Sequence, residues 1–254
     1  GPSWMTTQTI ATTPFNDQKP GTSGLRKKVT TFQTAHYLEN FVQSILNAAN
    51  SIGATIVIGG DGRFYNDTAI QTIIKMCSAN GVREVIIGQN GILSTPAASN
   101  LIRKHEAAGG FILSASHNPG GPNGDFGIKF NQANGGPAVE QLTEQFYNNS
   151  LNITEYRITD DPDIDLSEIG SAQSGHLNVT IIDAAADFVD LMSHLFDFDK
   201  IKNLFHSGSF RMRFDAMHAV TGPYAHALFE QIFGGLPHTV MNGTPLTDFG
   251  GGHP

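Results

Sequence analysis

The chain has 254 residues, of which 39% are hydrophobic, so it can bury a core of substantial size. Its formal net charge is −8 and its pI is near 5.6, and no run of Lys and Arg stands out. This balance excludes the electrostatic footprint of a nucleic-acid-binding protein. No apolar stretch approaches the ~20 residues that a bilayer span requires. We therefore expect a small-molecule ligand and no nucleic-acid or membrane partner.

The start of the chain and its single cysteine bear on its origin. Residues 1–4 precede Met5, and we interpret them as a cloning scar. Cys77 is the only cysteine and cannot form an intramolecular disulfide. The sequence does not open with the charged and apolar regions of a signal peptide. These features predict a cytoplasmic protein.

The first half of the chain alternates between helix and strand patterns. Apolar residues at three- and four-residue spacing predict an amphipathic helix over residues 37–49. The β-branched run at residues 54–58 predicts a buried parallel strand. A second helix, capped by Asn66 or Asp67, then leads to a second buried strand at residues 84–87.

The alternation continues after the second strand. Ser94 and Pro96 are typical of a helix start, and we expect that helix to reach residue 108. Residues 111–113 predict a third buried strand, and the short alternating run at 127–130 predicts an antiparallel edge strand. Two further helices are expected at residues 138–148 and 181–196. Together these elements predict an α/β fold, with a mixed, mostly parallel sheet sandwiched by helices.

The last part of the chain predicts a second unit of the same type. Residues 210–215 alternate as a strand and residues 224–233 are typical of a helix. These elements are too few to close a layered domain. We therefore expect a first domain at residues 5–190 and a truncated second domain at residues 191–254. Apolar side chains left uncovered there predict self-association.

The most informative segment is residues 114–125, Ser-Ala-Ser-His-Asn-Pro-Gly-Gly-Pro-Asn-Gly-Asp. It follows the third strand directly, at the carboxyl end where α/β proteins place ligands. Ser116 can carry a phosphate that nearby backbone amides solvate, and His117 beside it can transfer a proton or hydrogen-bond the phosphate. The alternative is an ordinary turn in which Ser and Asn side chains satisfy backbone groups.

Cations on either side of this loop suit the same chemistry. Lys129 can neutralise a phosphate or, with a pKa lowered by a neighbouring cation, act as a general base. The alternative for Lys129 is a solvent-facing side chain that protects an edge strand. Residues 19–27 combine glycines, hydroxyls and three cations, and Arg26 can bind a phosphate bidentately. A flexible surface turn is the alternative there. After the first buried strand, we expect an internal Asp61–Arg63 pair to steady the loop.

Two motifs carry a resemblance to a known family. Ser114-Ala115-Ser116-His117-Asn118-Pro119-Gly120-Gly121 resembles the phosphoserine loop of the α-D-phosphohexomutases, and Gly21-Thr22-Ser23-Gly24-Leu25-Arg26-Lys27 resembles their N-terminal signature. The long continuation at residues 120–129 resembles the glucose-specific branch. The resemblance implies that Ser116 is the phosphorylated serine, with His117 and Lys129 as its acid–base and electrostatic neighbours. It implies phosphate or substrate binding by Thr22, Ser23, Arg26 and Asn118.

The resemblance also implies a reaction. Glucose 1-phosphate and glucose 6-phosphate would interconvert through glucose 1,6-bisphosphate, which serves as activator, and Mg²⁺ would bind the phosphate on Ser116. The family's Asp-Gly-Asp-Gly-Asp-Arg metal loop and its Gly-Glu-Glu-Ser sugar loop do not occur in this sequence. We therefore expect little or no mutase activity from this chain alone. The alternatives are a non-catalytic phosphosugar-binding or regulatory protein and a mutase for another hexose phosphate.

Overall fold

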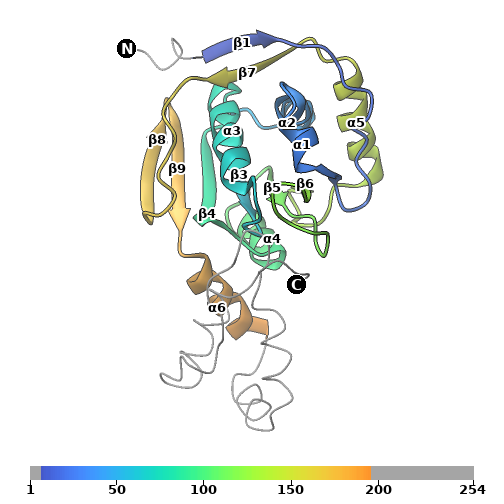
Figure 1. Cartoon of the computed structure of the whole chain (residues 1–254). Coiled ribbons are helices and arrows are strands. Elements are labelled where there is room, and N and C mark those ends of the chain that lie inside the picture. Colours follow the sequence, from blue (N-terminus) through green and yellow to red (C-terminus); the bar gives the residue numbers. More distant parts are fainter. Residues whose placement is uncertain (1–6, 196–254) are drawn as a thin grey trace.

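The computed structural model describes residues 7–195 (Figure 1). The predicted scar at residues 1–4 and nearly all of the predicted second domain lie outside these described residues. No helix within the described part is long and apolar enough to cross a bilayer.

A seven-stranded sheet forms the centre of the fold, in the order β2-β6-β5-β3-β4-β9-β8. The central strands β5, β3, β4 and β9 are parallel neighbours, whereas β6 and β8 pair antiparallel with theirs. Because β2 is also antiparallel to β6, it points the same way as the central strands. The predicted mixed, mostly parallel sheet is therefore confirmed. The strands are β2 (Leu25–Lys28), β3 (Thr55–Gly60), β4 (Glu84–Ile92), β5 (Gly109–Leu113), β6 (Asp125–Gln132), β8 (Gly170–Ser174) and β9 (Leu177–Ile182).

Helices cover both faces of this sheet. Side chains alternate between the two faces of a strand, so Ile56 and Ile58 of β3 join one core and Val57 joins the other. The first core contains α1 (Val29–Phe32), α2 (Tyr37–Ala48) and α3 (Asn66–Ala79); the second contains α4 (Thr95–Lys104) and α6 (Ala184–Leu195). The helix α5 (Glu140–Leu151) packs against α2, where Asn149 Nδ2 donates to the Ser44 carbonyl at 2.9 Å. The sandwich predicted from the sequence is therefore present.

A two-stranded ribbon lies outside the helices, at the top of Figure 1. Its antiparallel strands are β1 (Thr7–Ala11) and β7 (Glu155–Thr159). Arg157 ties the ribbon to two helices, because its backbone N–H donates to Gln43 Oε1 of α2 at 3.0 Å. Its Nε donates to Asn80 Oδ1, just beyond α3, at 3.0 Å.

Four details of the sequence prediction are wrong. β6 lies between β2 and β5, so it is not an edge strand. The last predicted helix begins too early, because Ile181 and Ile182 finish β9 and α6 starts at Ala184. Neither Asn66 nor Asp67 caps α3, whose N-cap is Tyr65 without a side-chain hydrogen bond. The helix expected to reach residue 108 ends at Lys104, because Glu106 adopts a left-handed φ of 51° and the Ala107 N–H bonds back to the Ile102 carbonyl.

Candidate active site

The serine loop, residues 114–124, joins β5 to β6 at the carboxyl end of β5. The loop that follows β3 begins at the same edge of the sheet. It lies beside the start of the serine loop, where the Asp61 N–H donates to the Leu113 carbonyl at 3.0 Å. The two backbones are so close that a Cβ added to Gly60 would lie 2.5 Å from the Leu113 carbonyl oxygen. Glycine at position 60 is therefore needed for this approach.

Ser116 stands exposed at the tip of a tightly bonded turn. Its backbone N–H donates to Ser114 Oγ at 3.1 Å, and the Asn118 N–H donates to the Ala115 carbonyl at 3.0 Å. The φ of Ser116 is 50°, in the left-handed region that few residues other than glycine adopt. Strain of this kind persists only where neighbouring contacts impose it, and it occurs often at functional sites.

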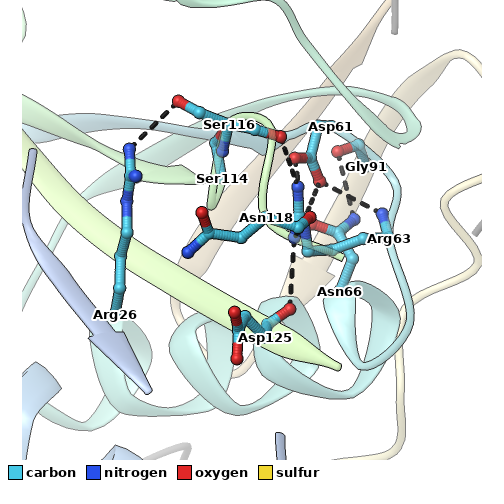
Figure 2. A network of polar contacts seen from close by, with 9 residues as sticks. All are labelled: Arg26, Asp61, Arg63, Asn66, Gly91, Ser114, Ser116, Asn118 and Asp125. Carbon is cyan, nitrogen blue, oxygen red and sulfur yellow. Dashed lines mark hydrogen bonds and ion pairs between the residues drawn. The ribbon is translucent and has the colours of Figure 1, made fainter. Parts of the chain in front are cut away.

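The Arg63 guanidinium holds the serine loop in shape by hydrogen bonds to backbone carbonyls (Figure 2). Its Nη2 donates to the Ser116 carbonyl at 3.0 Å, and its Nη1 donates to the carbonyls of Asn118 and Asp125, each at 3.2 Å. Its Nε contacts both carboxylate oxygens of Asp61, at 2.9 and 3.2 Å, so the predicted Asp61–Arg63 pair is confirmed. The Arg63 side chain is fully buried. Burial raises the pKa of Asp61, and the charge of Arg63 opposes that rise.

Arg26 approaches the same serine from β2. Its Nη2 donates to Ser116 Oγ at 3.0 Å, whereas its Nε is buried without a hydrogen-bond partner. The next two cations on the strand, Lys27 and Lys28, both form ion pairs with aspartates. Within residues 7–195, no carboxylate pairs with Arg26. Of the three consecutive cations, the one aimed at the serine hydroxyl is the one whose charge is left uncompensated.

Lys129 adds a second uncompensated cation. It lies on β6 and is half-buried, and it too forms no ion pair in the described part of the chain. Burial, and then the charge of Arg26, lower the pKa of Lys129. Lys129 is therefore not a solvent-facing lysine that protects an edge strand, because it is half-buried and β6 lies between β2 and β5. Lys129 thus lies near Arg26, whose guanidinium contacts Ser116 Oγ, and two neighbouring positive charges suit a phosphate.

The turn Gly21–Gly24 packs on Lys129. Gly21 and Gly24 bond each other's backbone at 3.0 and 3.1 Å, which leaves Thr22 and Ser23 exposed at the tip. Gly24 has a φ of 92°, and a Cβ there would lie 2.5 Å from the Cβ of Lys129. Thr22 and Lys129 line one narrow hollow beneath the turn.

The structure thus brings some predicted site residues together directly. Ser116 and Arg26 are in contact, and Thr22 and Lys129 line the same hollow. Asn118 is half-buried, and its carbonyl accepts a hydrogen bond from Arg63 Nη1. His117 is an exposed side chain on the turn of Ser116. The contacts of Arg63 with two loop carbonyls and with the carbonyl of Asp125, the first residue of β6, were not predicted. The only signal in the sequence was an arginine in a glycine-rich segment after a buried strand.

Metal-binding side chains do not cluster in the described part of the chain. Among residues 7–195, no group of three or more His, Cys, Asp and Glu side chains is placed to hold a metal ion. Mg²⁺ prefers several oxygen ligands in octahedral geometry. The described residues therefore do not form a magnesium site by themselves.

The fold and the site define an α/β/α domain that carries a strained serine in contact with an arginine that no carboxylate of the described residues neutralises. The family described as phosphoglucomutase/phosphomannomutase, alpha/beta/alpha domain I, matches residues 17–157. The chain belongs to this family.

Individual relatives agree with this assignment. A phosphoglucomutase of Rhizobium radiobacter is 56% identical over 248 residues, which cover 97% of this chain and 46% of the relative. A cytoplasmic phosphoglucomutase of Populus tremula is 50% identical over 258 residues, covering 96% and 44%. The solved structure of pp63/parafusin, a phosphoglucomutase from Paramecium, superposes with a TM-score of 0.88 at 42% identity, covering 98% and 47%. The chain thus spans less than half the length of these relatives, and similar relatives include chloroplastic as well as cytoplasmic proteins.

Proposed function

We propose that this chain is the phosphoryl-carrying part of a phosphoglucomutase, in which Ser116 exchanges a phosphoryl group with glucose phosphates. One observation carries the proposal: Arg26 Nη2 lies 3.0 Å from Ser116 Oγ with no carboxylate in the described residues to neutralise it. The choice of glucose rests on the relatives, since the family's description also covers phosphomannomutases.

The chemistry follows from these positions. The bond between Ser116 Oγ and phosphorus breaks as a sugar hydroxyl oxygen bonds to the phosphorus; the hydroxyl proton passes to a base, and the released Ser116 Oγ takes up a proton. The resulting glucose 1,6-bisphosphate returns its other phosphoryl group to Ser116 Oγ, which gives up its proton to a base, and the sugar oxygen that is released takes up a proton. Arg26 stabilises charge on the group in transfer. The lowered pKa of Lys129 suits the base, with the exposed His117 as the second candidate.

The remaining assignments are part of the same proposal. Thr22, Ser23 and Asn118 bind substrate or phosphate, and the phosphate of Ser116 offers one ligand to Mg²⁺. Residues 5–190 form the first domain, residues 191–254 begin a second, and the protein is cytoplasmic. Because the relatives are more than twice as long, we expect little or no complete turnover from this chain alone.

Phosphoryl acceptance provides the test. The chain is incubated with glucose 1,6-bisphosphate, and the gain of one phosphoryl group is followed by mass spectrometry with mapping to Ser116. Arg26→Met should slow the gain by about a hundredfold or more, because it removes a charged donor at the reacting group. Lys28→Met is the matched control, since it deletes a cation two residues away that pairs with Asp125. A wild-type chain that gains no phosphoryl group, or a Ser116→Ala variant that gains it equally, would refute the proposal.

A further inference from the structure

A strap precedes the turn at the phosphate site. We define the strap as residues 12–20, which lead from β1 towards Gly21. The strap is fixed to α2 near its start, where Asn40 Nδ2 donates to the Thr13 carbonyl at 3.0 Å. Two of its residues close to the turn, Asp17 and Gln18, contact a single residue of the core, Tyr37.

Gln18 is the less expected of these two contacts. Its side chain is 0% exposed, and its Nε2 donates to the Tyr37 carbonyl at 2.7 Å. Its Oε1 is buried without a hydrogen-bond partner, an arrangement that destabilises the folded state. An apolar side chain of the same shape would avoid that cost. The amide therefore gives little net stability, and what it provides is a directional bond between the strap and α2.

Asp17 binds the other end of the same tyrosine. Its Oδ1 accepts from the Tyr37 hydroxyl at 3.0 Å, and its Oδ2 pairs with Lys27 of β2 at 3.6 Å. Tyr37 is itself held rigidly, since it is 1% exposed and makes edge-on ring contacts with Phe15 and Phe32. The strap is thus joined to a fixed point just before the turn.

Little chain separates this fixed point from the site. Only Lys19 and Pro20 lie between Gln18 and Gly21, and the proline ring restricts the φ of that connection. At its other end the turn packs on Lys129 through Gly24. We propose that Gln18 is a positioning residue: its bond to Tyr37 holds the Gly21–Gly24 turn on Lys129 and so places Thr22 against the phosphate of Ser116. This inference rests on the proposed function.

The test compares Gln18→Met with Gln43→Met. Gln43 is a second fully buried glutamine, but its contacts are with Asn47, Asn80 and Arg157, at the ribbon. Gln18→Met should leave the thermal midpoint within about 2 °C of wild type, because it removes one bond together with one unpartnered acceptor. It should raise the concentration of glucose 1,6-bisphosphate that half-saturates Ser116 phosphorylation by about tenfold, as the phosphate-binding turn is misplaced. Gln43→Met should do the reverse, lowering the midpoint and leaving that concentration unchanged.

Two further measurements make the outcome decisive. In a Thr22→Val background, Gln18→Met should cause no further rise in the half-saturating concentration of glucose 1,6-bisphosphate, because Gln18 acts through Thr22. Hydrogen exchange at the Gly21 and Gly24 amides should become about tenfold faster in Gln18→Met, whether or not Ser116 is phosphorylated. The inference would be overturned if Gln18→Met left the amide exchange rates or the half-saturating concentration unchanged. It would also be overturned if Gln43→Met raised the half-saturating concentration as much as Gln18→Met does. If wild type accepts no phosphoryl group, the proposed function fails, and the exchange rates alone decide whether Gln18 anchors the turn.

Discussion

Replacing Arg63 by methionine tests how the serine loop is held. Arg63 is the counter-charge of Asp61 and the shared donor to the carbonyls of Ser116, Asn118 and Asp125. Methionine fills much of the same volume and makes none of these bonds. The variant therefore leaves a carboxylate that is 4% exposed without its partner.

The expected loss of stability is large. Removing one partner of a buried ion pair destabilises a fold by about 3–5 kcal/mol. The loop carbonyls add less, because the loop is exposed and water can replace the lost donor there. A loss of about 4 kcal/mol corresponds to a fall of about 8–16 °C in thermal midpoint for a chain of this size.

The loss should also depend on pH. Without Arg63, burial holds the folded-state pKa of Asp61 above its unfolded value, so the protonated form is the one that suits the fold. Stability of the variant is then retained below the unfolded pKa and lost as the pH rises through the folded pKa. The difference from wild type should accordingly be smaller near pH 5 than near pH 8.

Urea unfolding at several pH values measures both effects, with Lys75→Met as the matched control. Lys75 pairs with Asp163 at 2.6 Å, but the Asp163 side chain is 67% exposed, so breaking that pair should change stability by about 0–1 kcal/mol. An Arg63→Met variant no less stable than Lys75→Met would refute the reasoning, as would a loss that does not vary with pH. The double variant Asp61→Asn/Arg63→Met should recover part of the loss, because no charge remains buried.

Three other predictions concern the site itself. Lys129→Met should raise the thermal midpoint by about 2–4 °C, since it removes a destabilising charge. The folded-state pKa of Lys129 lies below its ordinary value of 10.5, so this gain should vanish in unfolding experiments carried out as the pH rises past that value. Ser116→Gly should be more stable than Ser116→Ala by about 1 kcal/mol in calorimetry, because only glycine adopts a φ of 50° without strain. Phosphorylation of Ser116 should raise the pKa of Lys129, measured by NMR titration of its side chain, because the phosphate supplies a counter-charge.

The sequence predicted those parts of the fold in which burial shapes composition. The continuous apolar runs within β3, β4 and β5 are buried on both faces, and no polar residue interrupts these runs. The start of α4 was also predictable, since Ser94 accepts a hydrogen bond from the Ala97 N–H at 3.3 Å. The strands at the periphery were missed. β8 reads Gly-Ser-Ala-Gln-Ser and pairs on one side only, so nothing in its composition distinguishes it from a loop.

The residues of the candidate site also divide into those that the sequence singled out and those that it did not. Ser116 and Arg26 belong to contiguous motifs, so local sequence is enough to single them out. The function of Arg63 depends on where three carbonyls from distant residues meet, and no spacing along the chain encodes that meeting point. Gln18 is a polar residue in a polar segment, and only its burial in the folded protein separates it from a surface side chain.

Three features of the site destabilise the domain when Ser116 carries no phosphate. Arg26 has a buried, unbonded Nε and no carboxylate partner in the described structure, and burial and the charge of Arg26 lower the pKa of the neighbouring Lys129. Ser116 occupies a left-handed conformation that its own side chain does not favour. Each of these destabilises the domain without phosphate, and a fold selected for stability alone would pair the cations with carboxylates, as it does for Lys27 and Lys28. We expect a phosphate on Ser116 to supply negative charge beside Arg26, whose Nη2 contacts the serine oxygen. In the described part of the chain, the unphosphorylated domain therefore lacks a negative charge beside Arg26, at the serine hydroxyl.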